Sequence, residues 1–407
     1  MKAILKRLPP FAPDYSGASA VFYPLGGAVI LNGADGCIGN VTGYDEPRFF
    51  NEPGRVFSSG LREIHAITGD EAVLLEKIRE ARLTGDIQFI LMLGTPTSAV
   101  IASDHQSLSR ILMDEQQIPV IPLNTTGMET YEIGASKAFE QLAVHWVKPG
   151  KKKKGGVNVI GATPLDYWGP EQMTLVRQAL EHYQLRINSI WGMDGNGMES
   201  IKATLEGDVN LVVSGAGLKA ARYLEKEYGM PYVTGVPVGK RSAKRLARKL
   251  KNPAGHHMMP LKASLSQMNS PGRSLVIGEQ IWANAFREYL EDEGGVSNVD
   301  VCSFFQMDKV LMEKDDRLLT TEDDLMELAS QNRYTLVVGD PLFQSFFQDE
   351  ALRFCPVPHL AVSSRLHWDH SLQYTGLFPD ALKQGRSLLH LKEASLKKEF
   401  RTQEAGK

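Results

Sequence analysis

The sequence predicts an α/β protein of three Rossmann-like domains, each a parallel four-stranded sheet flanked by helices, with a cleft between them. This prediction rests on a pattern that occurs three times: an apolar strand, a Gly/Pro turn, a helix and a second, proline-marked apolar strand. The copies run over Phe89–Leu123, Leu211–Val233 and Leu336–Val362. The length of 407 residues is too great for one ordinary core and suits two or three domains. Since open α/β sheets bind ligands beside the carboxyl ends of their strands, we expect sites in the clefts.

The first domain is predicted over residues 1–150. Its strand and turn lie in Gly26–Cys37, a helix is expected over Asp70–Arg82 because apolar residues recur at helical spacing, and a helix over Tyr131–Val147 closes it. The segment from Ile38 to Ser58 reads as a long polar loop, and loops of this length are usually functional or disordered. Its aromatic content argues against disorder. We therefore expect this loop to cover or build a site.

The second domain is predicted over residues 155–255 and the third, with a C-terminal helix, over 270–395. Both follow the same alternation of strands and helices, which favours parallel sheets with right-handed crossovers. The expected elements of the second domain are Val157–Pro164, Pro170–Tyr183, Arg186–Trp191, a glycine turn at Asp194–Gly197 and the repeat unit. Those of the third are Ser274–Gln280, a helix to Glu291, Val299–Phe304, an acidic helix over Glu322–Ser330 and the repeat unit.

Composition is that of a soluble globular protein, with 43% apolar and 23% charged residues and a net charge of -3. This charge gives no reason to expect a nucleic-acid partner. No stretch approaches the ~18 consecutive apolar residues of a membrane helix, and the N-terminus is too proline-rich for a signal peptide. We expect a cytoplasmic protein with no membrane partner. The basic segment Lys240–Lys251 has helical spacing, which is typical of an exposed helix face and also suits docking to an acidic protein.

The three cysteines, Cys37, Cys302 and Cys355, form no paired metal motif and no disulfide framework. Cys302 lies in a strand pattern and Cys355 is placed at the end of a helix, so both are interpreted as structural. Cys37 follows a strand in a small-residue turn with Asp35 and Gly36 beside it. A buried structural cysteine is one interpretation. The other is a thiolate that ligates iron or zinc, with a second subunit supplying further ligands.

The segment His359–Gly376 contains three of the ten histidines and follows the last repeat strand. His367 and His370 are three residues apart, so one helical turn could present both on the same side, and Asp369 could orient one of them. Surface polar residues are the alternative interpretation. The position beside a strand's carboxyl end favours ligand contact.

Two nucleotide motifs are missing from the sequence. No G-x-G-x-x-G follows a first strand and no Walker loop occurs, which argues against a nicotinamide enzyme and against intrinsic ATP hydrolysis. Glycine-rich turns before several helices could still hold an anion on free backbone N–H groups.

The chain resembles the nitrogenase component 1 superfamily, which includes the dinitrogenase subunits, their cofactor-scaffold relatives and the dark-operative protochlorophyllide reductase subunits. The resemblance lies in a glycine-cysteine turn, a Ser/Thr–acid–apolar–Gly segment, a second-domain glycine and strand pattern, and a His/Trp/Asp segment. These are Gly26–Gly39, Ser58–Ile78, Ile187–Ile201 with Leu211–Gly239, and Arg365–Gly376.

The resemblance implies an electron-transfer reaction. A separate, ATP-hydrolysing iron-sulfur reductase would dock and deliver electrons through a 4Fe-4S cluster shared across a subunit interface, in a homodimer or a heteromer with a related component 1 subunit. Cys37 would be the metal ligand, with Gly36 and Asp35 beside the cluster. The substrate would lie between the three domains, in a cavity lined by the catalytic segment His367, Trp368, Asp369 and His370.

The chain departs from the family at several cysteine positions. Asp14, Tyr15 and Ser16 stand where relatives commonly have a cysteine, Thr95 stands at another such position, and none lies near Val213–Ser214, where some catalytic subunits hold the large metal cofactor. Only Cys37 carries over as a cluster ligand. A scaffold for metal cofactor assembly and a binding partner with a vestigial cluster therefore remain alternatives to a reductase.

Overall fold

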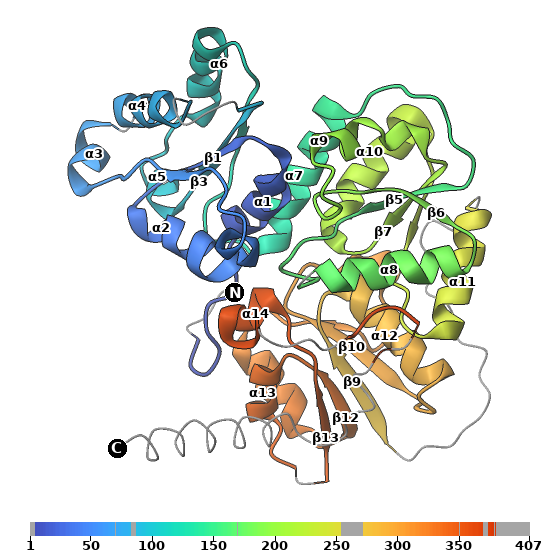
Figure 1. Cartoon of the computed structure of the whole chain (residues 1–407). Helices are drawn as coiled ribbons and strands as arrows, with labels where there is room; N and C mark the ends of the chain where they lie inside the picture. The colour runs from blue at the N-terminus through green and yellow to red at the C-terminus, as the bar shows by residue number, and fades with distance from the viewer. Residues whose placement is uncertain are drawn as a thin grey trace, which may run out of the picture.

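The computed structural model describes residues 5–69, 71–82, 87–168, 170–253, 272–349, 351–368, 373–377 and 379. Three separate sheets follow one another along the chain, and every strand pair in them is parallel. Figure 1 shows the first sheet in blue, the second in green and the third in orange, around a central region that holds the start of the chain. The predicted α/β fold with three parallel sheets is confirmed.

The three sheets share one strand order. In spatial order, the first contains β2 (Val56–Ser58), β1 (Ala28–Asn32), β3 (Ile90–Gly94) and β4 (Val120–Leu123). The second contains β6 (Arg186–Ile190), β5 (Gly156–Ile160), β7 (Val209–Val212) and β8 (Tyr232–Thr234). The third contains β11 (Arg317–Leu318), β10 (Val299–Ser303), β9 (Arg273–Ile277), β12 (Tyr334–Gly339) and β13 (Arg353–Pro356). The third sheet thus adds a short edge strand, β11, to the expected four.

This order creates a switch point in each sheet, between the two central strands from which the chain turns in opposite directions. The switch points lie at β1/β3, β5/β7 and β9/β12. Ligands of open α/β sheets bind in the crevice outside the carboxyl ends of such strands. The segments that follow these six strands are therefore the first places to look for a site.

Helices connect the strands and cover the sheets (Figure 1). Around the first sheet lie α1 (Asp14–Phe22), α2 (Asp35–Asn40), α3 (Glu63–Thr68), α4 (Glu71–Arg82), α5 (Pro96–Val100), α6 (His105–Gln116) and α7 (Tyr131–Trp146). The second sheet has α8 (Pro170–His182), α9 (Met198–Lys202), α10 (Leu218–Tyr228) and α11 (Lys240–Lys251). The third has α12 (Gln280–Asp292), α13 (Glu322–Ser330) and α14 (Leu360–Ser363).

Two local predictions differ from the structure. The segment after Cys37 is not an extended loop, because α2 continues into a π-helical turn at Val41–Asp45 and a 3-10 turn at Pro47–Phe50 before β2. Cys355 lies inside strand β13 and not at the end of a helix. The short apolar run before Pro356 fits an edge strand, because its pairing with β12 needs no N–H from the proline.

Helix α1, which the sequence pattern did not predict, is wholly buried against α7. The two helices cross at Gly17 and Gly134, where an added Cβ would collide with the backbone carbonyl of Tyr131 and of Asp14 respectively. Only glycine permits so close a backbone approach. The crossing fixes Tyr15 of α1 under the first sheet's carboxyl edge.

The hydrophobic core is shared between the sheets. One cluster joins the second sheet to the third, another joins the first sheet to α10 and β5 of the second, and a third joins α1, α7 and the third sheet. The sheets therefore pack as parts of one body, while the predicted domain boundaries stay a prediction. Among the described residues, no helix is long and apolar enough to cross a membrane.

Candidate functional site

Cys37 lies in the first turn of α2, directly after β1 and at the first switch point. Its side chain is half-buried and packs against the core cluster of α1 and the first sheet, whereas Asp35 and Gly36 beside it are exposed. The cysteine is thus placed at the surface but held by the core. This is the location that the sequence predicted for it.

Two hydroxyl groups meet the Cys37 thiol, from Tyr15 of α1 and from Thr95, which directly follows β3. Burial raises the pKa of the thiol, and these two hydrogen bonds partly offset that rise. Thr95 Oγ1 donates to the Asn32 carbonyl oxygen at 2.8 Å, and this hydrogen bond joins the ends of β1 and β3. Tyr15 and Thr95 are two of the positions at which the sequence lacks an expected cysteine, and the fold brings both to Cys37.

Glycine occupies positions 36, 39 and 43 of this helical segment; the first two are exposed and Gly43 is partly buried. A Cβ added to Gly36, Gly39 or Gly43 would meet no atom within 4 Å, and none of the three has a positive φ. The fold of this chain therefore needs glycine at none of them. Glycines without such a need suit close approach by a second molecule.

One chain provides one thiol for a metal. Among the described residues, no group of three or more His, Cys, Asp or Glu side chains is arranged to hold an ion. Cys302 and Cys355 are buried, and burial raises the pKa of their thiols to about 12 and about 11. Cys37 thus offers one thiol ligand, and the described residues around it do not complete a cluster site.

The predicted catalytic segment is described in part. His367 ends a 3-10 turn and Trp368 follows it, whereas Asp369 and His370 lie outside the described residues. The Trp368 ring contacts Phe50 at 5.4 Å and Trp168 at 5.9 Å between ring centroids, and the Trp168 indole N–H donates to the Trp368 carbonyl oxygen at 2.6 Å.

Arg365 joins the same group of rings. Its guanidinium carbon lies 5.9 Å from the ring centroid of Tyr44, 5.7 Å from that of Phe50 and 5.6 Å from that of Trp368. We call Tyr44, Phe50, Trp168 and Trp368 the aromatic cluster. It combines the segment after Cys37, the segment after β5 and the C-terminal segment, which supports the expectation that the predicted loop helps to build a site. Tyr44 and Phe50 are 50% and 57% exposed.

A second polar group lies deeper, where the ends of the second and third sheets meet α7. Asp166, after β5, accepts hydrogen bonds from the Tyr131 hydroxyl and from Thr163 Oγ1. His359 Nε2 lies 3.4 Å from Asp166 Oδ1, and Glu279, after β9, accepts from the Gly215 N–H at 2.9 Å. We call Tyr131, Asp166, Glu279 and His359 the acidic junction. All four are buried except His359, which is partly buried.

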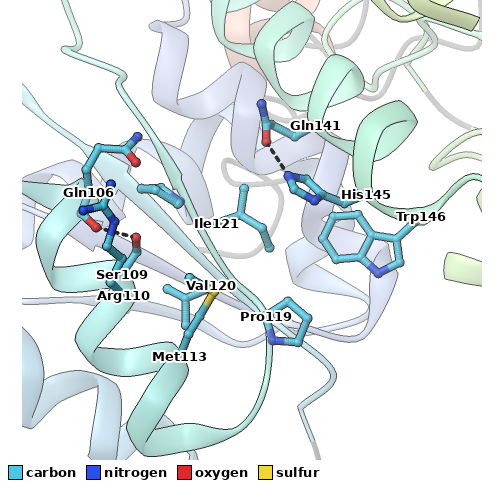
Figure 2. Close-up of a pocket in the computed structure, with 11 residues that line it drawn as sticks. Gln106, Ser109, Arg110, Met113, Pro119, Val120, Ile121, Gln141, His145 and Trp146 are labelled. Atoms are coloured by element: carbon cyan, nitrogen blue, oxygen red, sulfur yellow. Dashed lines mark hydrogen bonds between the residues drawn. The ribbon is translucent and has the colours of Figure 1, made fainter. Parts of the chain in front are cut away.

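A pocket of about 390 Å³ lies apart from Cys37, the aromatic cluster and the acidic junction. Figure 2 shows it beside β4 and between α6 and α7, with the Arg110 side chain on one wall and His145, hydrogen-bonded to Gln141, on the other. This pocket is lined by neither Cys37 nor the aromatic cluster nor the acidic junction.

Comparison with known protein families matches residues 13–270 to the family described as nitrogenase component 1 type oxidoreductase. The matched residues make up more than half of the chain. The chain belongs to this family. The predicted resemblance is confirmed.

Two relatives indicate the range of this nitrogenase component 1 type family. A light-independent protochlorophyllide reductase subunit of Gloeothece citriformis is 27% identical over 173 residues, which cover 40% of this chain and 34% of that protein. The nitrogenase iron-molybdenum cofactor biosynthesis protein NifE of Mesorhizobium japonicum is 24% identical over 186 residues, 44% of this chain and 36% of that protein. The aligned part thus spans about a third of each relative.

The solved structure of nitrogenase Cp1 at pH 6.5 has the same fold. It superposes with a TM-score of 0.70 at 16% sequence identity, over 98% of this chain and 95% of that chain. At this identity the likeness concerns the fold alone.

The sequence singled out Cys37 and the segment around Trp368, whose roles stay predictions, and gave no indication of the acidic junction. Tyr131, Asp166 and Glu279 come from three separate segments, and no spacing rule connects them. A usable signal existed for two of them, because Asp166 and Glu279 lie in small-residue turns of the kind that can hold an anion. Those turns hold carboxylates of the chain itself.

Proposed function

We propose that this chain is a component 1 subunit that accepts electrons from a separate, ATP-hydrolysing iron-sulfur reductase and reduces a substrate bound between the three domains. One observation carries the proposal: the first switch point presents a half-buried thiol on a helix whose outer glycine face is uncovered. A thiol in this setting suits a cluster that is completed by another subunit.

Cys37 would hold the cluster in this proposal, and the exposed carboxylate of Asp35 is available as a supplementary ligand. The partner is a second copy of the chain or a related component 1 subunit, which approaches over Gly36 and Gly39. A bound 4Fe-4S cluster supplies one-electron transfer at this surface. The role of the chain's own residues is to place the thiol, exclude solvent on the core side and leave the outer side open.

The aromatic cluster is the proposed substrate wall. The rings of Phe50, Trp168 and Trp368 offer flat apolar contact area, and the Arg365 guanidinium adds a positive charge beside them. These features suit an unsaturated ring substrate that carries an acidic group. His367, and with it Asp369 and His370, remain proposed cavity residues. The three cysteines form no disulfide with one another, which suits the reducing cytoplasm that we propose as the location of the chain.

The test of the cluster is metal analysis after anaerobic purification. The wild-type chain, reconstituted with ferrous iron and sulfide, is expected to bind iron and to absorb in the visible range, and Cys37→Ala is expected to lose both signals. Cys302→Ala is the matched control, since it removes a thiol that is buried in a strand, and it is expected to retain the iron. Equal iron in wild type and Cys37→Ala would refute the cluster assignment.

A scaffold for metal cofactor assembly is the second candidate. It is favoured by the similarity to NifE, whose name describes cofactor biosynthesis, and by the single thiol at the first switch point. Both functions use the same surface. ATP-dependent turnover with a cognate reductase would support the first candidate, whereas transfer of bound metal to another protein without turnover would support the second.

A further inference from the structure

The acidic junction collects titratable side chains from separate parts of the chain. Asp166 follows β5, Glu279 follows β9 and His359 follows β13, so the ends of the second and third sheets face each other here. Glu279 connects the two sheets directly, because its carboxylate accepts from the N–H of Gly215 at 2.9 Å and from that of Trp282 at 3.0 Å. Tyr131 adds α7 as a third wall.

Hydrogen bonds link Tyr131, Asp166 and His359 into one network. The Tyr131 hydroxyl donates to Asp166 and lies 3.4 Å from His359 Nε2, which is itself 3.4 Å from Asp166 Oδ1. The backbone N–H of His359 donates to Asp340 Oδ2 at 2.8 Å. A proton can therefore move between Asp166, Tyr131 and His359 with only small shifts of the side chains.

The junction has more buried carboxyl groups than cations. In the part of the chain that the structure describes, His359 is the one basic side chain within ion-pairing distance of Asp166, Glu279 or Asp340. Burial raises the pKa of Glu279 to about 7, with the nearby Asp166 charge adding to the rise, and burial raises that of Asp340 to about 6. The titratable side chains that face one another here are Tyr131, Glu132, Asp166, Tyr167, Glu279, Asp340, His359 and Tyr374.

A small pocket lies between Glu279 and two of the hydrogen-bonded side chains, Asp166 and His359. The pocket, of about 20 Å³, is lined by Asp166, Glu279, Trp282 and His359, and this volume holds one water molecule. The buried indole N–H of Trp282 has no hydrogen-bond partner among the described residues. A water in the pocket would lie between Glu279 and His359 and could bridge them.

We propose that Asp166, Glu279 and His359, joined through Tyr131 and one water, form a proton relay that supplies the reduction. The relay rests on the proposed function, and it assigns the source of the protons for that reduction. A two-electron reduction of an unsaturated bond consumes two protons as the reductase delivers two electrons, and forms two new bonds to hydrogen. Glu279 and the His359–Asp166 pair release these protons and are then reprotonated from solvent.

The first test needs no turnover. The infrared spectrum of the wild-type chain is expected to show a protonated carboxyl band whose intensity falls with a midpoint near pH 7, and Glu279→Gln is expected to remove this component. Glu322→Gln is the matched control, because Glu322 is also buried and accepts three backbone N–H bonds but has a lowered pKa. The control is expected to keep the band. Other buried carboxyl groups with a raised pKa, such as Asp340 and Glu288, contribute to the band in both proteins, so the wild-type minus Glu279→Gln difference spectrum is the readout. A difference spectrum without a carboxyl component that titrates near pH 7 overturns the relay.

The second test uses turnover with the cognate reductase and ATP. Asp166→Asn is expected to lower kcat roughly 100-fold, a typical loss for a proton-transfer group, and to alter the pH profile, with little change in KM. An unchanged kcat and pH profile would overturn the relay. If wild type turns over no substrate with a reductase, the proposed function fails, whereas the infrared result still decides whether the junction stores protons.

Discussion

Cys37 and the acidic junction both lie at switch points of the same fold, yet they are built in opposite ways. Cys37 lies half-buried on a short surface helix, beside the exposed Gly36 and Gly39. The junction is buried and satisfies most of its polar atoms internally. Under our proposals, the first site needs another molecule to complete it, whereas the second contains its reacting groups within this chain.

The largest expected effect comes from adding a thiol to the incomplete site. Because the Thr95 hydroxyl already meets the Cys37 thiol, Thr95→Cys places a second thiol at the same point. Iron affinity of the reconstituted chain is expected to rise at least ~10-fold, since thiolates are the ligands that iron-sulfur clusters use. The measurement is iron retained against a chelator series.

Thr125→Cys is the control for this gain. Its hydroxyl is also buried and donates to the Gly94 carbonyl oxygen at 2.7 Å, at the same end of β3. It is expected to leave iron affinity at the wild-type level. If both variants gain iron equally, the gain does not depend on closeness to Cys37. Cys37 would then not mark an incomplete metal site.

Most of the strands were predicted from the sequence because each is a local run of apolar residues. The position of Cys37 directly after β1 also follows from neighbouring residues, whereas its role and that of the Trp368 segment stay predictions. Helix α1 was missed because its residues, Asp14–Phe22, are buried on all sides and show no amphipathic pattern. The junction was missed because the meeting of Tyr131, Asp166 and Glu279 depends on how the sheets pack, which no single segment encodes.

The next largest effect is expected for Glu279→Gln, in how the free energy of unfolding depends on pH. The raised pKa of Glu279 means that the native state favours its protonated form. The stabilisation that Glu279 gives the native state is therefore complete below the usual glutamate pKa, about 4.5. It is lost as the pH rises through about 7, the pKa of Glu279 in the folded chain. Glu279→Gln is expected to reduce the difference in unfolding free energy between pH 5 and pH 8 by up to about 3 kcal/mol. Urea unfolding at the two pH values measures it.

Glu322→Gln should behave in the opposite sense. Burial alone would raise the pKa of Glu322, but three backbone hydrogen bonds outweigh it and hold this pKa low. The stabilisation that ionised Glu322 gives the native state is therefore complete above the usual glutamate pKa and is lost as the pH falls below it. This variant is expected to lose stability at pH 8. Identical pH responses in the two variants would show that the junction is an ordinary buried carboxylate site.

The smallest effect on folding is expected at the glycine face of α2. Gly36 lies inside the helix, and an alanine Cβ there would meet nothing within 4 Å. Gly36→Ala is therefore expected to change the free energy of unfolding by less than about 1 kcal/mol, in the stabilising direction, because alanine favours a helix over glycine. Gly134→Ala, by contrast, would collide with the Asp14 carbonyl and should unfold the chain. If Gly36→Ala keeps the fold but weakens oligomerisation in sedimentation, glycine at this position serves the partner; unchanged oligomerisation would mean that the partner binds elsewhere.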